Sequence, residues 1–344
     1  MEPKIYILIL NYKGWFDTIE CLESVFSLNY NNYRVVVCDN NSGDGSIEYL
    51  EMWANGKLNL VNTPGQSVGV PHDNFCKKPI KYNKLYNSGK ICFDEIYDVN
   101  ILTFIQNDEN NGYAGGNNVG INYILKDKSC KFIWILNNDT VVDSMCLNFL
   151  VEKAMTSHNI GICGSTIFYY YDPTTIQMQG GGQFNKYTGS VKNIGCFRKK
   201  GNLLTESEVM NRLSYVSGAS ALVSRAFIET IGLMDESYFL YFEEIDWISR
   251  NRGRFVIGYE PMAIVYHKDG SSISPVRDKA TVSEFADYCG VRSRFIFYHK
   301  FYKHLLPLQY FLLIVVFINR VLRKQANRIP RLMMASLEIW KINK

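Results

Sequence analysis

Continuous apolar segments alternate with amphipathic ones along the first half of the chain. Four runs are rich in β-branched and aromatic residues, which is typical of buried parallel strands. These runs are residues 4–10, 34–38, 101–105 and 132–136. Residues 18–28 and 46–53 instead carry apolar side chains at helical spacing. The alternation predicts a doubly wound α/β sheet with helices on both faces.

Each predicted strand ends in a cluster of polar side chains. The clusters are Asn11 and Tyr12, Asp39 to Asn41, Asn107 and Asp108, and Asn137 to Asp139. Ligands bind outside the carboxyl ends of the strands in open parallel sheets, so the clusters predict a binding site along one rim. Asparagine and aspartate after a single strand are also ordinary turn residues. Four such clusters together favour a site.

A glycine-rich segment, residues 110–120, follows the third strand and precedes a helix-like stretch at 121–125. A turn of this kind lets the backbone approach a ligand, and the amino end of a helix attracts phosphate. The glycines at 112, 115 and 116 lack the spacing of a dinucleotide-binding loop, which argues against a dehydrogenase. The alternative is a tight turn with close packing.

Two polar stretches interrupt the alternation. Residues 63–98 contain three prolines and many polar side chains, which predicts an excursion from the sheet. A surface loop is favoured there over a lid, because no apolar periodicity survives. The second stretch, residues 180–214, begins with three glycines and could close over a ligand.

Three acids, Glu243, Glu244 and Asp246, lie in an aromatic segment. Desolvation and mutual repulsion are expected to raise the pKa of at least one of them, as a general base requires. The alternative is a helix start, where acids favour the positive end of the dipole and later arginines pair with them. Aromatic residues among acids also suit sugar binding.

Asp139, beside Asn137 and Asn138, is a candidate ligand for a divalent cation that bridges phosphate oxygens. His267 ends another apolar run, residues 263–266, and could add a nitrogen ligand to the same cation. A lone histidine after a strand is more often structural, so its value depends on its proximity to Asp139.

Composition and charge narrow the class of protein. With 344 residues, 47% apolar and 20% charged, the chain can bury a full core, which excludes a disordered or collagen-like protein. Nine scattered cysteines without a C-x-x-C pair argue against a zinc ribbon or a disulfide framework and favour a reducing compartment. The net charge of +4 is uneven, because residues 301–344 hold eight Lys or Arg and one acid.

The basic tail contains an apolar run, residues 305–318, flanked by cations. The run is shorter than the ~20 residues of a spanning helix, so it is expected to lie in a membrane interface. Residues 329–340 predict a second, amphipathic helix. The alternative is packing of both helices on the catalytic domain or on a second subunit. Nucleic acid is a weaker candidate, since the cations flank a solid apolar block.

The ordered motifs resemble the family 2 inverting glycosyltransferases, particularly the rhamnosyltransferase-like branch, over most of residues 4–272. The motifs that carry the resemblance are residues 9–12, 37–46, 111–120, 136–139, 216–219, 231–236, 243–246 and 267–272. The resemblance implies a glycosyltransferase A-type fold, which is a Rossmann-like mixed sheet with helices on both faces. It also implies a nucleotide-sugar half (1–145, with 63–98 inserted), an acceptor and catalytic half (146–275) and a helical, membrane-associated tail (276–344).

The resemblance assigns roles to individual residues. The nucleotide-sugar pocket would be formed by Leu10, Tyr12, Asp39, Asn41, Gly115, Asn117, Asn118, Asn137 and Asn138, with Asp39 on the base. Asp139 and His267 would hold Mn²⁺ or Mg²⁺, and Gly218 and Trp247 would line the acceptor site. Glu244 would be the base; the family usually has Asp there, so Glu243 and Asp246 stay open.

The function that follows is inverting hexosyl or rhamnosyl transfer from a nucleotide-diphosphate sugar to a glycan or lipid-linked glycan. We expect it at the cytoplasmic face of the cell membrane, attached peripherally or monotopically through residues 300–341, with a homo-oligomer possible and no nucleic acid partner. Two rivals are a catalytically silent sugar-binding scaffold with the same fold and a nucleotidyltransferase.

Overall fold

The computed structural model describes residues 2–58, 76–87, 100–268 and 283–340. Its centre is a mixed ten-stranded sheet with the order β3-β4-β2-β1-β5-β12-β7-β13-β6, and β8 pairs with β7. The four strands predicted from apolar runs are present as β1 (Lys4–Asn11), β2 (Tyr33–Asp39), β4 (Leu102–Asn107) and β5 (Cys130–Asn137). They are neighbours in the order β4-β2-β1-β5 and run parallel, so the predicted parallel layer is confirmed.

The sheet continues past β5 into the second half of the chain. β12 (Ser220–Ser224) runs antiparallel to both β5 and β7 (Ile160–Tyr169), and β13 (Val256–His267) is parallel to β7. β6 (Thr140–Val142) closes this edge, and β8 (Asp172–Gln179) is antiparallel to β7. The reversed strands make the sheet mixed, and one layer carries both halves proposed from the sequence.

The expected excursion at 63–98 is wrong for its central part. Residues Tyr82–Asn87 form β3, which pairs in parallel with β4 at the edge of the sheet. An edge strand has one neighbour and exposed positions, so it tolerates the polar sequence YNKLYN. Such a sequence resembles that of a loop, which is why the strand was not predicted. Residues 63–75 and 88–98 lie outside the described residues.

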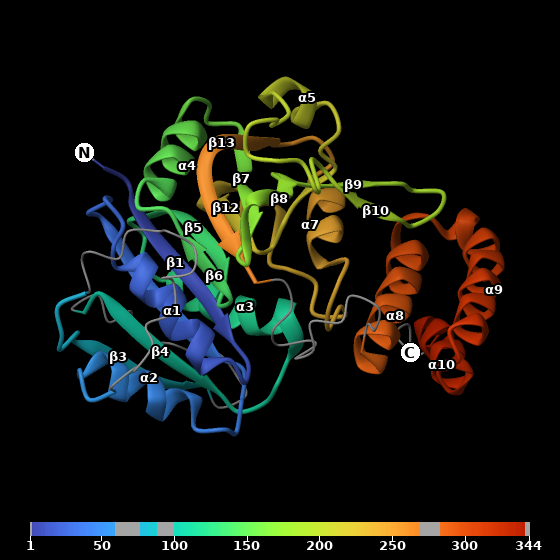
Figure 1. Cartoon of the computed structure of the whole chain (residues 1–344), viewed down its shortest axis with the longest axis horizontal. Coiled ribbons are helices and arrows are strands. Elements are labelled where there is room, and N and C mark those ends of the chain that lie inside the picture. Colours follow the sequence, from blue (N-terminus) through green and yellow to red (C-terminus); the bar gives the residue numbers. More distant parts are fainter. Residues whose placement is uncertain (1, 59–75, 88–99, 269–282, 341–344) are drawn as a thin grey trace.

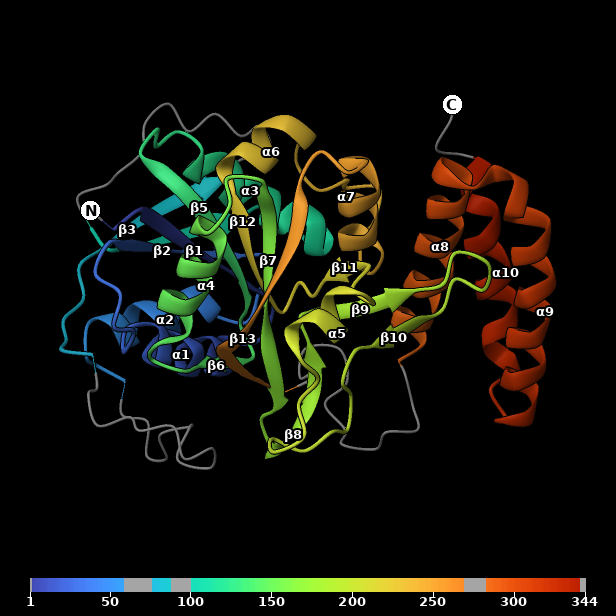
Figure 2. The same ribbon diagram turned by 90° about the horizontal axis from the view of Figure 1, so that it is seen from above.

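Helices cover both faces of the sheet, as predicted (Figures 1 and 2). α1 (Trp15–Val25), α2 (Ser46–Ala54) and α4 (Cys146–Met155) pack on one face, where Ile5, Ile7 and Ile9 of β1 enter the core. α3 (Gly112–Ile124), α6 (Arg225–Ile231) and α7 (Glu243–Asn251) pack on the other, against Tyr6 and Leu8. The alternation along β1 follows from the two-residue period of a strand.

The glycine-rich segment is mostly helix, which corrects the expected turn before residue 121. α3 begins at Gly112, and only this glycine has a left-handed backbone, with φ of 68°. Within the helix, a Cβ at Gly116 would lie 2.5 Å from Leu10, and one at Gly120 would lie 2.2 Å from Leu8. These glycines let α3 pack closely on β1, which is the close-packing alternative.

The polar stretch at residues 180–214 contains two short strands of a small second sheet. β9 (Gly181–Phe184) lies between β10 (Val191–Asn193) and β11 (Tyr215–Val216), and α5 (Glu206–Met210) follows β10. β11 leads directly into Gly218. The closing of this region over a ligand stays a prediction.

The tail forms a helical bundle beside the sheet domain: α8 (Glu284–Phe301), α9 (Leu306–Leu322) and α10 (Ile329–Leu337) (Figure 1). The apolar run expected at 305–318 is longer in the structure. Residues Lys303–Leu322 make one helix of 20 residues that is long and apolar enough to cross a membrane by length and composition. Pro307 does not interrupt it, because proline is tolerated in the first turn of a helix.

Candidate active site

The polar ends of the parallel strands meet at one rim, as the sequence predicted. Asn11 Nδ2 donates to Asp39 Oδ1 at 2.6 Å, and Asn138 Nδ2 donates to Asn11 Oδ1 at 3.4 Å. On the other side, Asn107 Nδ2 donates to Asn40 Oδ1 at 3.2 Å. The ends of β1, β2, β4 and β5 therefore share one hydrogen-bonded network.

Asp39 is buried within this network, and both of its carboxylate oxygens accept hydrogen bonds. Asn11 and Ser42 donate to Oδ1, and Gln106 Nε2 donates to Oδ2 at 2.8 Å. A nucleotide base would have to share or replace one of these donors, so the assignment of Asp39 to the base stays a prediction. The half-buried Tyr12 follows Asn11, and the exposed Asn41 donates to the Asp108 carbonyl at 2.8 Å.

The two predicted pocket residues on α3 have different environments. Asn118 is satisfied within the fold: Nδ2 donates to the Met234 carbonyl and to Glu236, and Oδ1 accepts from Met234 N. These bonds give it a structural role in holding the loop before α7. Asn117 Nδ2 donates to the Tyr113 carbonyl, but its buried Oδ1 has no hydrogen-bond partner among the described residues. An unpaired buried acceptor is unfavourable, so Asn117 is the better candidate for contact with a ligand hydroxyl.

Asp139 and His267 lie together, although they are far apart in the sequence. His267 Nε2 is 3.1 Å from Asp139 Oδ1, and its Nδ1 is 2.8 Å from Gln177 Oε1 on β8. Because the Gln177 oxygen can only accept a hydrogen bond, His267 Nδ1 is the donor in this contact. The other ring nitrogen, Nε2, faces the Asp139 carboxylate. Asn137 Nδ2 approaches the same Nε2 at 3.5 Å.

This arrangement fits a divalent cation that also binds phosphate. Within residues 2–58, 76–87, 100–268 and 283–340, no three His, Cys, Asp or Glu side chains gather as a closed metal site. One carboxylate and one imidazole nitrogen, aligned by Gln177, are the ligands that Mn²⁺ accepts, and Mg²⁺ and Mn²⁺ sites commonly take further oxygens from substrate phosphates. Asp139 and His267 would be the residues that hold the ion.

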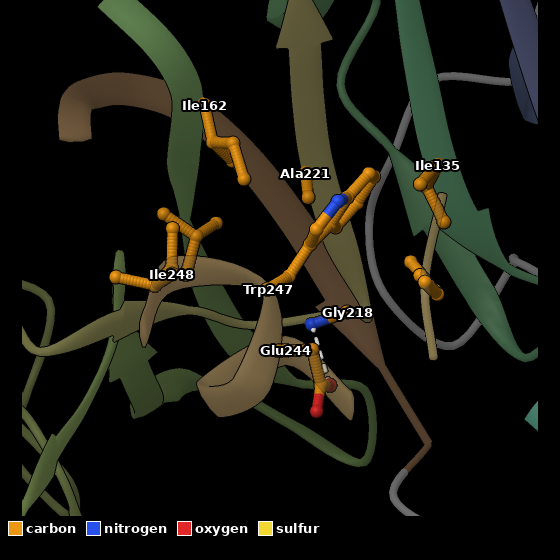
Figure 3. Close-up of a pocket in the computed structure, with 9 residues that line it drawn as sticks. Ile135, Ile162, Gly218, Ala221, Glu244, Trp247 and Ile248 are labelled. Carbon is orange, nitrogen blue, oxygen red and sulfur yellow. Dashed lines mark hydrogen bonds between the residues drawn. The ribbon is translucent and has the colours of Figure 1, made fainter. Parts of the chain in front are cut away.

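Glu243 and Glu244 open α7 directly after two residues with left-handed backbones. Tyr241 and Phe242 have φ of 69° and 72°. This bend directs Glu244 toward β11, where its Oε1 accepts from the Gly218 amide at 3.2 Å (Figure 3). A Cβ at Gly218 would lie 2.6 Å from both Glu244 Oε1 and the Tyr113 hydroxyl, so only glycine fits between them.

Both glutamates have raised pKa values. Burial raises the pKa of Glu244, and burial together with the charge of Glu244 raises the pKa of Glu243 well above its usual value. Glu243 Oε2 is buried without a hydrogen-bond partner among the described residues. Burial first, and then the charges of Glu244, Glu243 and Asp139, raise the pKa of the Tyr113 phenol.

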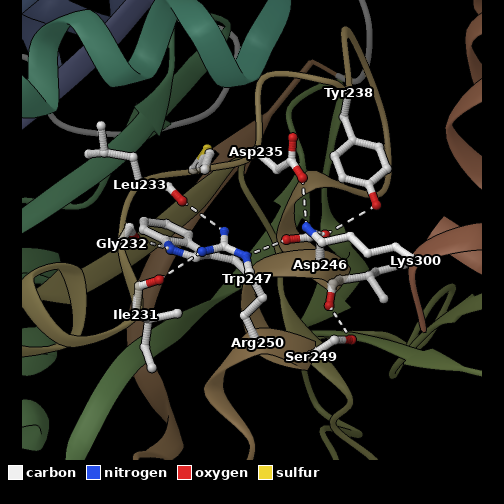
Figure 4. A network of polar contacts seen from close by, with 12 residues as sticks. Ile231, Gly232, Leu233, Asp235, Tyr238, Asp246, Trp247, Ser249, Arg250 and Lys300 are labelled. Atoms are coloured by element: carbon white, nitrogen blue, oxygen red, sulfur yellow. Dashed lines mark hydrogen bonds and ion pairs between the residues drawn. The ribbon is translucent and has the colours of Figure 1, made fainter. Parts of the chain in front are cut away.

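Asp246 is committed to a separate ionic network (Figure 4). Arg250 Nε lies 2.5 Å from Oδ1, while Tyr238 OH at 3.1 Å and Lys300 Nζ at 2.5 Å donate to Oδ2. Lys300 also contacts Asp235 at 2.6 Å. Two cations and a hydroxyl therefore already contact the fully buried Asp246 carboxylate, which leaves less room there for a substrate hydroxyl than at the glutamates.

α8 also holds the loop that leads to the two glutamates. Arg292 donates to the Ser237 carbonyl at 2.6 Å, and Ser293 Oγ donates to the Leu240 carbonyl at 2.8 Å. Arg292 and Ser293, which contact this loop, and Lys300, which contacts Asp246, therefore all lie on α8.

Glu244 and Gly218 also border a small apolar pocket between β12 and α7 (Figure 3). Its lining residues are Ile135, Ile162, Val216, Gly218, Ala221, Met234, Glu244, Trp247 and Ile248. Trp247 is buried against Phe227, and its Nε1 donates to the Gly232 carbonyl at 2.8 Å. Trp247 therefore packs in the core beside this pocket, and its expected role in acceptor binding, like that of Gly218, stays a prediction.

Three residues near the site escaped the sequence analysis: Tyr113, Gln177 and Lys300. Tyr113 lies in the glycine-rich motif, so its position beside Asn110 and Asn111 was the available signal. Gln177 and Lys300 come from β8 and α8, far along the chain from the groups they contact, and carry no local pattern.

Comparison with known proteins places the chain. The Glycosyl transferase family 2 model matches residues 6–70 and 94–232, more than half of the chain. The chain is 26% identical over 199 residues to the low-salt glycan biosynthesis hexosyltransferase Agl10 of Haloferax volcanii. This match covers 57% of the chain and 59% of the relative, so the chain spans about three-fifths of that protein's length.

Two solved structures share the architecture. The mannosyltransferase PcManGT from Pyrobaculum calidifontis, in complex with GDP-Man and Mn²⁺, has a TM-score of 0.52 and 11% identity, covering 100% of this chain and 89% of that one. GalNAc-T7 with UDP, GalNAc and Mn²⁺ has a TM-score of 0.52 and 15% identity, covering 86% and 50%. Such likeness shows the fold, and the expected glycosyltransferase A-type fold is confirmed. By its matched residues, the chain belongs to the Glycosyl transferase family 2.

Proposed function

We propose that the protein transfers a sugar from a nucleotide-diphosphate donor to an acceptor hydroxyl with inversion at the anomeric carbon. The observation that carries the proposal is the meeting of Glu244, Gly218 and Tyr113 on the side of the sheet that also holds Asp139 and His267. A partly buried carboxylate with a raised pKa thereby lies on the same side of the sheet as residues suited to a diphosphate-bound cation.

Glu244 is the proposed base. Its carboxylate accepts the proton of the acceptor hydroxyl as that oxygen attacks the anomeric carbon from the face opposite the leaving diphosphate. The Gly218 amide fixes Oε1, which leaves Oε2 for the acceptor. One displacement inverts the carbon, and no covalent intermediate with the protein is needed. Glu243, buried behind it, acts on the pKa of the pair.

Asp139 and His267 would hold Mn²⁺ or Mg²⁺, which when bound supplies positive charge to the departing diphosphate. Gln177 keeps the imidazole in the orientation that directs Nε2 to this position. The chain's own contribution is to fix both ligands on neighbouring strand ends.

The donor would lie along the polar rim, with Leu10, Tyr12, Asp39 and Asn41 toward the nucleotide and Asn117, Asn137 and Asn138 toward the sugar phosphate. Support comes from the structural neighbours, whose complexes contain GDP-Man, or UDP with GalNAc, each with Mn²⁺. We propose a hexosyl or rhamnosyl group as the transferred sugar, in keeping with the motifs and with the hexosyltransferase relative.

The proposed acceptor is a glycan or lipid-linked glycan, bound on the side of Gly218. The relative's role in glycan biosynthesis and the apolar helix at 303–322 support attachment of the chain to a membrane, at its cytoplasmic face. The same proposal includes the division of the chain into residues 1–145, 146–275 and 276–344. It also includes the possible homo-oligomer.

A thermal-shift panel tests the donor site directly. The full chain is heated with UDP, TDP, GDP or CDP, each with and without Mn²⁺, because a ligand that binds only the folded state raises Tm. We expect one diphosphate to stabilise the protein only when Mn²⁺ is present, and Asp139→Ala to abolish that shift. No shift with any diphosphate, in folded protein, would favour a silent scaffold; release of pyrophosphate from a nucleoside triphosphate would favour a nucleotidyltransferase.

A further inference from the structure

α9 is apolar on two opposite sides. Its inner side packs on the bundle, where Leu313 and Gln309 are buried. The opposite side, here called the outer face, consists of Phe311, Ile314, Val315, Ile318, Val321 and Leu322. These residues recur at spacings of three and four, which puts them on one stripe of the helix.

The outer face is exposed along the whole length of α9. Its six side chains are between 44% and 75% exposed. Both ribbon views place α9 at the end of the molecule remote from the sheet (Figures 1 and 2). On α10, Met333, Met334 and Leu337 add exposed apolar side chains. A continuous apolar stripe of this kind on a soluble surface marks an interaction site.

Exposed cations flank the outer face at both ends of α9. Lys303 precedes the helix, and Arg323 and Lys324 follow it. An apolar stripe between clusters of Lys and Arg is complementary to an anionic bilayer surface, where acyl chains lie beneath negative headgroups. A second copy of the chain would bring the same cations together, which disfavours that occupant.

Length alone would allow α9 to cross a membrane, but its inner side is tied to α8 by polar contacts. Near one end, Arg294 Nε donates to Gln309 Oε1 at 2.8 Å. Near the other, Arg320 makes two hydrogen bonds to Asp287, at 2.7 and 2.6 Å. Gln309 and Arg320 are separated by roughly 16 Å along a helix that rises about 1.5 Å per residue.

A spanning orientation would carry these contacts into the hydrocarbon. About 20 residues are needed to cross it, so both ends of the 303–322 helix would be used. The Asp287–Arg320 pair and the Arg294–Gln309 bond would then either break or draw charged side chains of α8 into lipid. Either outcome is strongly unfavourable. A helix lying in the membrane plane keeps every contact and still buries the outer face.

We propose that α9 docks the protein onto an anionic membrane in the plane of the interface, with the outer face in the acyl region and the inner side still bound to α8. This deepens the proposed membrane location of the enzyme and rests on it for its biological purpose. The full chain is expected to bind the lipid surface without any sugar substrate.

Vesicle flotation tests the docking face. The full chain is mixed with preformed vesicles of phosphatidylcholine, with or without phosphatidylglycerol. We expect strong co-flotation only with the anionic lipid, and a loss of about tenfold or more in the partition coefficient for Phe311→Ser/Ile318→Ser, given the apolar area removed. Met262→Ser is the matched control, because Met262 is 57% exposed and Ile318 is 54% exposed. Arg323→Glu/Lys324→Glu is expected to abolish the preference for phosphatidylglycerol.

Protease access distinguishes in-plane docking from spanning. A tag fused after Lys344 should stay fully cleavable when protein bound to the outside of sealed vesicles meets protease. A protected tag would overturn the proposal in favour of spanning. Absence of co-flotation would overturn it as well, and a dimer lost on Phe311→Ser/Ile318→Ser would identify a second copy as the occupant. The diphosphate thermal shift, measured without vesicles, reports separately on the proposed transferase site.

Discussion

Lys300 Nζ, near the end of α8, lies 2.5 Å from Asp246 Oδ2 on α7, across 54 residues of sequence. With Arg250 on the other carboxylate oxygen, Asp246 is contacted by two cations inside the protein. The tail is thereby joined to the acidic segment by an ion pair whose acid is fully buried. Glu243 and Glu244 have no such cation partner among the residues that the structure describes.

We expect Lys300→Met to lower the free energy of unfolding by about 2 kcal/mol, because the buried Asp246 loses one of its two cations while Lys300 itself is partly solvated. Urea denaturation measures the change, with an unaltered m-value as the sign of an intact native state. Lys300→Arg should restore most of the loss. The exposed Lys303→Met is the control; an equal effect there would contradict the assigned role of Lys300.

Glu244→Gln is expected to reduce kcat by about 10²- to 10⁴-fold, the usual contribution of a general base. Stabilisation by the nucleoside diphosphate should be unchanged, since the amide still accepts from Gly218. The matched variant Glu243→Gln should have the smaller effect. Were the order of the two reversed in steady-state assays, the base would be Glu243.

The pKa of Glu243 gives a prediction about stability and pH. Because burial and Glu244 raise it in the folded state, the folded protein binds more protons than the unfolded chain between the two pKa values. Stability is thus lost as pH rises from the ordinary glutamate range through the raised pKa. Glu243→Gln removes this loss, at about 1.4 kcal/mol per pKa unit.

Melting curves from pH 5 to pH 8 measure this effect. The Tm of Glu243→Gln should exceed that of the unmodified protein by a margin that grows with pH. A margin that is constant or shrinks toward pH 8 would show that Glu243 is not held in its protonated form by the fold.

Gly218→Ala should impair catalysis without unfolding the protein. The new Cβ would lie 2.6 Å from both Glu244 Oε1 and the Tyr113 hydroxyl, so the base must move. We expect kcat to fall by about tenfold or more, since small displacements of a catalytic group are costly. Gly201→Ala is the control, because nothing lies within 4 Å of its Cβ. Equal kcat values for the two variants would argue against the position assigned to Glu244.

Gln177→Leu tests the alignment of His267. Loss of the 2.8 Å contact frees the ring to rotate, so the Mn²⁺ concentration needed for half-maximal stabilisation by the nucleoside diphosphate should rise by about tenfold. The measurement is a metal titration of Tm, independent of turnover. An unchanged midpoint would mean that His267 is not a metal ligand or is aligned by other contacts.

The central sheet could be predicted from the sequence because buried parallel strands have a local signature. β1, β2, β4 and β5 are continuous apolar runs, and the α/β alternation predicts that they run parallel but does not specify their order in the sheet. β3 escaped because an edge strand has no need of such a run. α3 was placed too late along the chain, since glycine disfavours helix and only the close approach to Leu8 and Leu10 explains its presence there.

The site could be predicted as far as residue types at strand ends allow. Asp139 and His267 were expected to lie close together and are 3.1 Å apart, whereas Glu244 was preferred as the base only through the resemblance, with Glu243 and Asp246 left open. That choice depends on Lys300, which reaches the acids only in the folded chain. Gln309 similarly interrupted the apolar run in sequence, but in the structure it is buried and paired with Arg294.

The anchoring of the 237–242 loop on α8 has a practical consequence for work with this protein. A version that ends before Ser283, made to remove the apolar tail, would also lose the side chains that hold Ser237 and Leu240. It would lose Lys300, one of the two cations on Asp246, as well. Such a shortened protein is expected to be more soluble, but its residues 237–246 would lose the contacts that hold them in place. A better version for purification would keep α8 and carry polar substitutions on the outer face of α9.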